Sequence, residues 1–162
     1  MIDRRILIGV SLLSVAALSQ SCSDTVAAPV LATDFVATLS GANERPTPNA
    51  STATGSATVS ITDNSLTFNI TVAGLTSITA AHIHVGKASV SGGILVNLSP
   101  AAPPTGTFSG ILNSGTITAA DLANAPITLS SLAALIRNGD TYINVHTVAN
   151  APGEIRGQLV AK

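Results

Sequence analysis

The strongest constraint on the fold is an alternation of apolar and polar residues in the first half of the chain. Apolar residues occupy every second position from Leu66 to Val72, and threonine or asparagine fills the positions between them. Successive side chains of a strand point to opposite faces, so this period predicts a strand with one buried face. Residues 58–62 alternate in the same way, and the turn-forming pair Asp63-Asn64 separates the two stretches. Together they predict an antiparallel hairpin.

Short strand patterns continue along the rest of the chain. Two helical signals interrupt them: Thr118 and Asp121 have the spacing of a capping box, and a second segment, capped by Ser130 or Ser131, ends near Arg137. Many short strands with turn-rich connections predict an all-β fold, an antiparallel Greek-key-like β-sandwich or barrel with one or two short helices. The further strands are expected at residues 35–40, 80–85, 94–98, 107–112, 142–147 and 154–160.

The N-terminus has the pattern of an export signal. Arg4 and Arg5 precede an apolar run over residues 6–18. That run has the length of a secretory signal, whereas a membrane-spanning helix needs about 20 apolar residues. It leads to the one cysteine of the chain, Cys22, which follows a small residue. This arrangement resembles the lipobox of bacterial lipoproteins, and the resemblance implies cleavage before Cys22 and lipidation of its side chain.

The chain therefore divides into three expected parts. Residues 1–21 are a lipoprotein signal peptide, residues 22–33 are the lipidated cysteine and a short tether, and residues 34–162 are one domain. The alternative is an ordinary signal peptide in which Cys22 is incidental. In the first case the domain is exported and lipid-anchored in the cell envelope, on the periplasmic face or the cell surface, and the lipid makes the membrane its partner.

Composition excludes several classes of function. Charged residues are 9% of the chain, aromatic residues are 2% and the net charge is −1. A nucleic-acid-binding surface needs a basic stripe, so we expect no nucleic-acid partner. One cysteine excludes a disulfide framework, and no nucleophile elbow or phosphate-binding loop occurs. These absences favour a non-catalytic module.

The three histidines of the chain are its one chemical constellation. His82 and His84 are two residues apart and share a strand face. His146 shares a face with Tyr142 and Asn144 in a later strand. If these strands lie close together, three imidazoles converge, and that ligand set suits zinc or copper with a fourth position open. The alternative is that the rings bond to nearby carbonyls and carboxylates, such as those of Glu44, Asp140 and Glu154.

Charged residues are scarce, so the few that share strand faces are expected to pair. Glu154 and Arg156 alternate on one face of the last expected strands. We expect them to form a structural polar cluster with Glu44 and Asn144 rather than a ligand site.

Four segments carry a family resemblance: residues 39–46 (LSGANERP), Gly74-Leu75 with residues 81–86 (AHIHVG), residues 121–136, and residues 142–159. In this order they resemble the CHRD domain, which is named from chordin and occurs in many bacterial secreted proteins. The resemblance covers residues 35–160. It implies a β-rich domain of extracellular or envelope type, and the family has no established catalytic residues.

A shorter resemblance concerns the histidines alone. The His-x-His pair and the Val-His strand are similar to part of the copper site of copper–zinc superoxide dismutase. Two functions are therefore expected. The first is a lipid-anchored, non-catalytic binding or structural module with an unknown protein or glycan partner. The alternative is a copper- or zinc-binding protein, with superoxide-dismutase-like redox activity as its enzymatic form.

Overall fold

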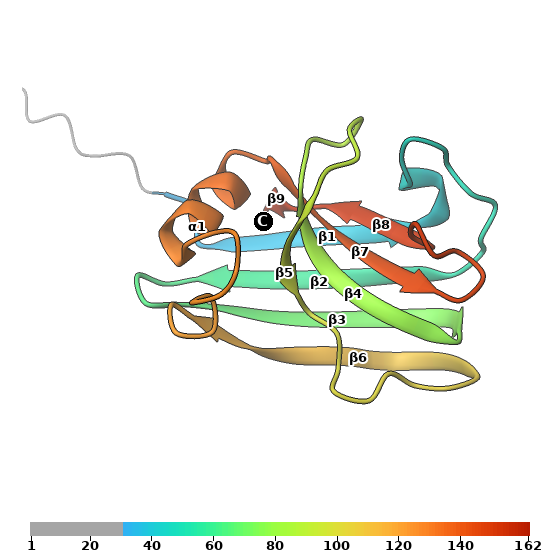
Figure 1. Cartoon of the computed structure of the whole chain (residues 1–162). Helices are drawn as coiled ribbons and strands as arrows, with labels where there is room; N and C mark the ends of the chain where they lie inside the picture. The colour runs from blue at the N-terminus through green and yellow to red at the C-terminus, as the bar shows by residue number, and fades with distance from the viewer. Residues whose placement is uncertain (1–30) are drawn as a thin grey trace, which may run out of the picture.

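The computed structural model describes residues 31–162, in which strands form one curled antiparallel sheet (Figure 1). The path through the sheet is β5-β4-β7-β8-β1-β2-β3-β6, and β9 pairs with β1. Curling brings β4 and β5 across the front of β1, β2 and β3 in Figure 1. The strands are β1 (Asp34–Ser40), β2 (Thr54–Ile61), β3 (Ser65–Thr76), β4 (Ile78–Val85), β5 (Ile94–Asn97), β6 (Thr107–Thr118), β7 (Thr141–Thr147), β8 (Ile155–Gln158) and β9 (Val160–Ala161). The expected all-β class is confirmed.

The predicted hairpin is the pair β2 and β3. Their register runs without a break from Thr54 opposite Ala73 to Ile61 opposite Leu66. Inward side chains of both strands are buried; Val59 and Leu66, for example, are at most 1% exposed. Burial of each such side chain contributes roughly 1.5–3 kcal/mol, and so the alternation in the sequence fixes which face of the hairpin lines the core.

Two short helices accompany the strands: the 3₁₀ turn η1 (Gly41–Asn43) and the helix α1 (Leu129–Arg137). The expectation that Ser130 or Ser131 caps α1 was wrong. The hydroxyl of Thr128 caps it and accepts a hydrogen bond from the backbone N–H of Ser131 at 3.2 Å. Leu129 is buried, so the helix begins early enough to place that side chain in the core.

The first helical signal yields hydrogen-bonded turns over residues 119–124, as expected, which do not extend into a regular helix. Asp121 accepts hydrogen bonds from the backbone N–H and the hydroxyl of Thr118, as a capping residue would. The residues that follow form turns and bends up to the start of α1. Pro126 keeps these turns short, because proline lacks a backbone N–H and disfavours helical geometry in the residue before it.

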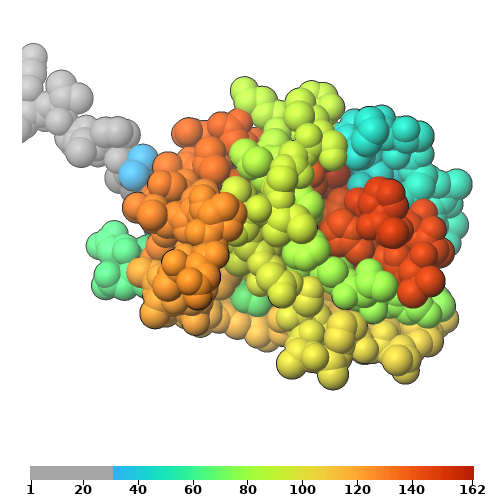
Figure 2. All heavy atoms as spheres, viewed as in Figure 1, coloured from blue at the N-terminus to red at the C-terminus, as the bar shows by residue number. Residues whose placement is uncertain are grey.

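The part of the sheet that matters for function is the trio β4, β7 and β8. One side of these strands contributes Ile83, Ile143 and Val145 to the core. The opposite side is polar and is covered by loops, among them residues 86–93, called the 86–93 loop below. In Figure 2 the lime segment with this loop adjoins the cyan segment around η1. Between residues 31 and 162, no helix has the length and apolar character needed to cross a membrane.

Candidate metal centre

The pairing of β4 with β7 brings the three histidines together. In this pairing His82 lies opposite Asn144, and His146 lies opposite Ala80. His82, His84 and His146 therefore share the polar side of the two strands. Each offers a ring nitrogen, and these three nitrogens all lie within 4.8 Å of one another.

Backbone carbonyls fix the protonation of two rings. Nδ1 of His84 lies 2.9 Å from the carbonyl oxygen of Gly92, and Nδ1 of His146 lies 3.0 Å from that of Ala151. A carbonyl oxygen only accepts, so each Nδ1 carries the proton and donates it. Each Nε2 is then unprotonated and can accept a hydrogen bond or bind a metal. Such outer hydrogen bonds are what orient imidazoles that ligate metals.

The third ring closes the cluster. Nδ1 of His82 lies 3.1 Å from Nε2 of His146. Because the proton of His146 sits on Nδ1, its Nε2 accepts and His82 donates. A cation between the two rings would displace that proton, as metals do when they compete with protons for a ligand.

His84 Nε2 is the unsatisfied atom of the cluster. The side chain is 7% exposed, and Nε2 is buried with no hydrogen-bond partner among residues 31–162. An unpaired buried acceptor costs about 1–3 kcal/mol, so most buried polar atoms find a partner. The lone pair of His84 therefore lacks a partner that a ligand would supply.

Stacking holds the ring of His84 in place. It lies parallel to the ring of Tyr142, with the centroids 4.9 Å apart and the planes at 9°. The Tyr142 hydroxyl accepts a hydrogen bond from the N–H of Gly92 at 3.1 Å. The guanidinium carbon of Arg156 stands 3.4 Å from the Tyr142 centroid, in cation–π geometry. Tyr142 thus positions both the imidazole and the carbonyl that orients it.

The surroundings keep the three imidazoles neutral. Burial lowers the pKa of His82 to about 4, and the neighbouring His146 and His84 add to the effect. Burial also lowers the pKa of His84 and of His146. Neutral imidazoles near pH 7 offer lone pairs, which is the form that ligates metals.

Glu44 and Asn144 form a buried pair beside the histidines. Nδ2 of Asn144 lies 3.1 Å from both carboxyl oxygens of Glu44. Burial raises the pKa of Glu44 to about 7, although the bond from Asn144 opposes the shift. Gly153, at a φ of +145°, packs against the pair, and a Cβ there would lie 2.5 Å from Asn144 Nδ2.

The expected polar cluster of four residues is split in the structure. Glu44 and Asn144 are in direct contact, whereas Glu154 accepts hydrogen bonds from Ser51 at 2.7 Å and from Thr147. Arg156 lies opposite Asn144 in the pairing of β7 with β8, but its hydrogen bonds go to the 86–93 loop. Burial raises the pKa of Glu154, yet the hydroxyl bonds outweigh it and leave the pKa lowered.

Sequence reasoning did not identify which groups the histidine rings bond to. Loop carbonyls and the carboxylates of Glu44, Asp140 and Glu154 were both considered as acceptors; the rings of His84 and His146 bond to the carbonyls of Gly92 and Ala151. No sequence signal marks a backbone carbonyl in a loop. The stacking residue Tyr142 had a signal, because it shares a strand face with His146. Cys22 lies outside the described residues.

The donor set defines what the centre can bind. Three neutral nitrogens without a thiolate or carboxylate suit zinc and copper, and disfavour magnesium and calcium, which prefer oxygen. Three protein ligands also leave a fourth position for water or a partner's group.

Comparison with known proteins places the chain in a family. The model of the CHRD domain matches residues 35–159, which include all three histidines, Glu44, Tyr142 and Arg156. No curated protein and no solved structure matches the chain. Since the match spans most of the sequence and runs from β1 to the end of β8, the chain belongs to the CHRD domain family.

Proposed function

We propose that this chain is a non-catalytic metal-binding module, anchored in the cell envelope by a lipid on Cys22, that holds one zinc or copper ion on His82, His84 and His146. The observation that carries the metal site is the buried, unpartnered Nε2 of His84. A bound zinc or copper ion would accept this lone pair.

Two features favour a metal over a purely structural role for the rings. A structural network would pair every ring nitrogen, since an unpaired buried acceptor is costly. Here the outer nitrogens of His84 and His146 are bonded to carbonyls, while the inner nitrogens face a shared centre. Histidines that ligate metals have the same arrangement: one ring nitrogen binds the metal and the other donates a hydrogen bond to the protein.

The metal content of the full-length chain, purified in detergent without a histidine tag, tests the site. After loading with zinc or copper and exhaustive dialysis, we expect about one equivalent. His84→Gln removes the unpartnered lone pair and should abolish retention, and the half-buried ligand His146 gives a second variant, His146→Gln. The matched control is Asn124→Gln, an exposed amide on a turn. Retention by both histidine variants at the control's level would refute the site.

The lipid anchor rests on the sequence around Cys22. A basic pair, an apolar run and a solitary cysteine follow one another in the order that export and lipidation need. We expect the mature chain to begin at Cys22, to carry a covalent lipid by mass spectrometry and to sediment with membranes. Cys22→Ser should move it to the soluble fraction, and an unmodified Cys22 in the mature chain would contradict the anchor.

A superoxide assay separates the proposal from its enzymatic alternative. With copper loaded, a non-catalytic module consumes superoxide no faster than the same concentration of free copper. Faster consumption that His84→Gln removes would instead make the chain a metal-dependent redox enzyme.

A further inference from the structure

A second polar feature lies beside β8, where Arg156 stacks on Tyr142. It is a small pocket of about 110 Å³ lined by Asn43, Arg45, Ala88, Arg156 and Gln158. The pocket forms where the 86–93 loop meets the segment after η1, the lime and cyan segments that adjoin in Figure 2. Each liquid water occupies about 30 Å³, so the space suits a group of a few heavy atoms.

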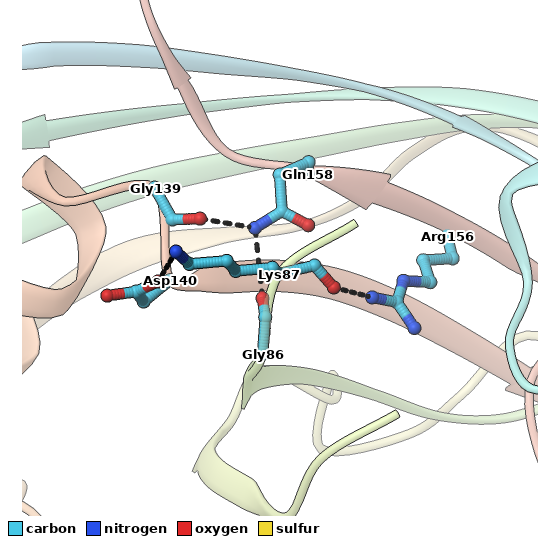
Figure 3. A network of polar contacts seen from close by, with 6 residues as sticks. All are labelled: Gly86, Lys87, Gly139, Asp140, Arg156 and Gln158. Carbon is cyan, nitrogen blue, oxygen red and sulfur yellow. Dashed lines mark hydrogen bonds and ion pairs between the residues drawn. The ribbon is translucent and has the colours of Figure 1, made fainter. Parts of the chain in front are cut away.

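Arg156 brings a buried positive charge to this pocket. The side chain is 1% exposed. Its Nη2 donates to the carbonyl of Lys87 at 2.8 Å (Figure 3) and to that of Val90, also at 2.8 Å. No carboxylate of residues 31–162 lies within 4.0 Å, because the one ion pair there joins Lys87 to Asp140 at 3.9 Å. The ring of Tyr142 offsets part of the charge. The remaining N–H groups of Arg156 are free to donate to an anion. A buried guanidinium binds an anion strongly.

Gln158 adds an acceptor with a fixed orientation. Its Nε2 donates to the carbonyls of Gly86 at 2.9 Å and Gly139 at 2.8 Å (Figure 3). These two bonds determine which way the amide faces, so Oε1 cannot exchange places with the nitrogen. Oε1 is buried with no hydrogen-bond partner among residues 31–162. A ligand group that reached Oε1 would satisfy it only as a hydrogen-bond donor.

The charges around the pocket have a positive balance. Arg45 also lines the pocket. Its Nη1 donates hydrogen bonds to the carbonyls of Ala42 and Glu44, and its other nitrogens remain available for a ligand. The carboxyl of Glu44 is close enough to interact with the charges of Arg156 and Arg45, but its hydrogen bonds come from Asn144 rather than from either guanidinium.

We propose that this pocket binds a small hydroxycarboxylate, with the carboxylate on the guanidinium groups of Arg45 and Arg156 and the hydroxyl donating to Oε1 of Gln158. The proposal is independent of the metal site. The same chemistry is offered by a free hydroxy acid and by an acidic sugar at the end of a glycan, and the choice of probe distinguishes the two.

The direct test is a titration of the full-length chain, followed by amide chemical shifts. Lactate should shift the signals of residues 43–45, 86–90 and 156–158. Propionate lacks the hydroxyl and should bind about three- to tenfold more weakly, and lactamide lacks the charge and should bind at least about tenfold more weakly. Tighter binding of glucuronate than of lactate assigns the site to acidic sugars, and the reverse order assigns it to free hydroxy acids.

Variants separate this site from general attraction of anions. Arg45→Gln should weaken lactate binding about tenfold, because it removes a charge-assisted contact at the pocket rim. Arg137→Gln is the matched control, since it removes the same charge at α1, where Arg137 donates to Ala32, and should change nothing. Absence of lactate-induced shifts at the pocket, or equal weakening by both variants, would overturn the proposal. Metal retention should be unaffected by lactate, so either proposal can fail alone.

Discussion

The buried carboxyl of Glu44 makes a specific prediction about stability and pH. Its pKa is about 7 in the folded domain and 4.5 in its ordinary state, a difference of 2.5. At 1.36 kcal/mol per pKa unit, this corresponds to roughly 3 kcal/mol. The folded state binds this proton more tightly than the unfolded state. Its contribution is therefore fully present below pH 4.5 and is lost as the pH rises through 7.

Glu44→Gln tests this reasoning because the amide keeps an acceptor for Asn144 but cannot ionise. The variant and the wild type should have similar free energies of unfolding near pH 4.5. At pH 8 the variant should be the more stable by up to about 3 kcal/mol, since it buries no charge. Urea unfolding followed by circular dichroism at both pH values measures the difference. A difference between the two proteins that does not change with pH would refute the assignment.

Three further substitutions test the packing around the candidate centre and the capping of α1. Gly153→Ala places a Cβ 2.5 Å from Nδ2 of Asn144 at a φ of +145° and should cost about 2–3 kcal/mol in urea unfolding; a loss below about 0.5 kcal/mol would contradict the contact. Tyr142→Phe removes the acceptor for the N–H of Gly92 and should cost about 1–2 kcal/mol, with faster hydrogen exchange at that amide; unchanged exchange would refute the bond. Thr128→Ala should cost about 1 kcal/mol through loss of the cap of α1, and no loss would place the cap elsewhere.

Period-2 patterning explains what the sequence could predict. It placed the hairpin β2–β3, and it put His82 with His84 and His146 with Tyr142 on single faces. These are local consequences of strand geometry. The adjacency of β4 and β7 is not local, because β5, β6 and α1 lie between these two strands in the chain. The face pattern alone could therefore give this adjacency only as a condition for the three histidines to converge.

The features that escaped prediction depend on loops and on competition between local signals. The carbonyls of Gly92 and Ala151 orient the imidazoles, but every residue has a carbonyl and the sequence does not mark these two. β6 continues to Thr118, whereas the expected strand ended at residue 112. The expectation was too short because glycine and serine interrupt the apolar pattern of the strand. One closing strand was expected over residues 154–160, but the structure has two, β8 and β9. β8 ends at Gln158, whose side chain donates a hydrogen bond to Gly86 in the 86–93 loop.

The central claim is that three imidazoles with fixed tautomers form a metal centre. Long-range nitrogen–proton correlation spectra of the rings, before and after one equivalent of zinc, test it directly. In the metal-free chain, His84 and His146 should carry their protons on Nδ1. Zinc should then shift both Nε2 signals and Nδ1 of His82 while the Nδ1 protons of His84 and His146 remain. Protons on Nε2 in the metal-free chain, or ring signals that zinc leaves unchanged, would contradict the account.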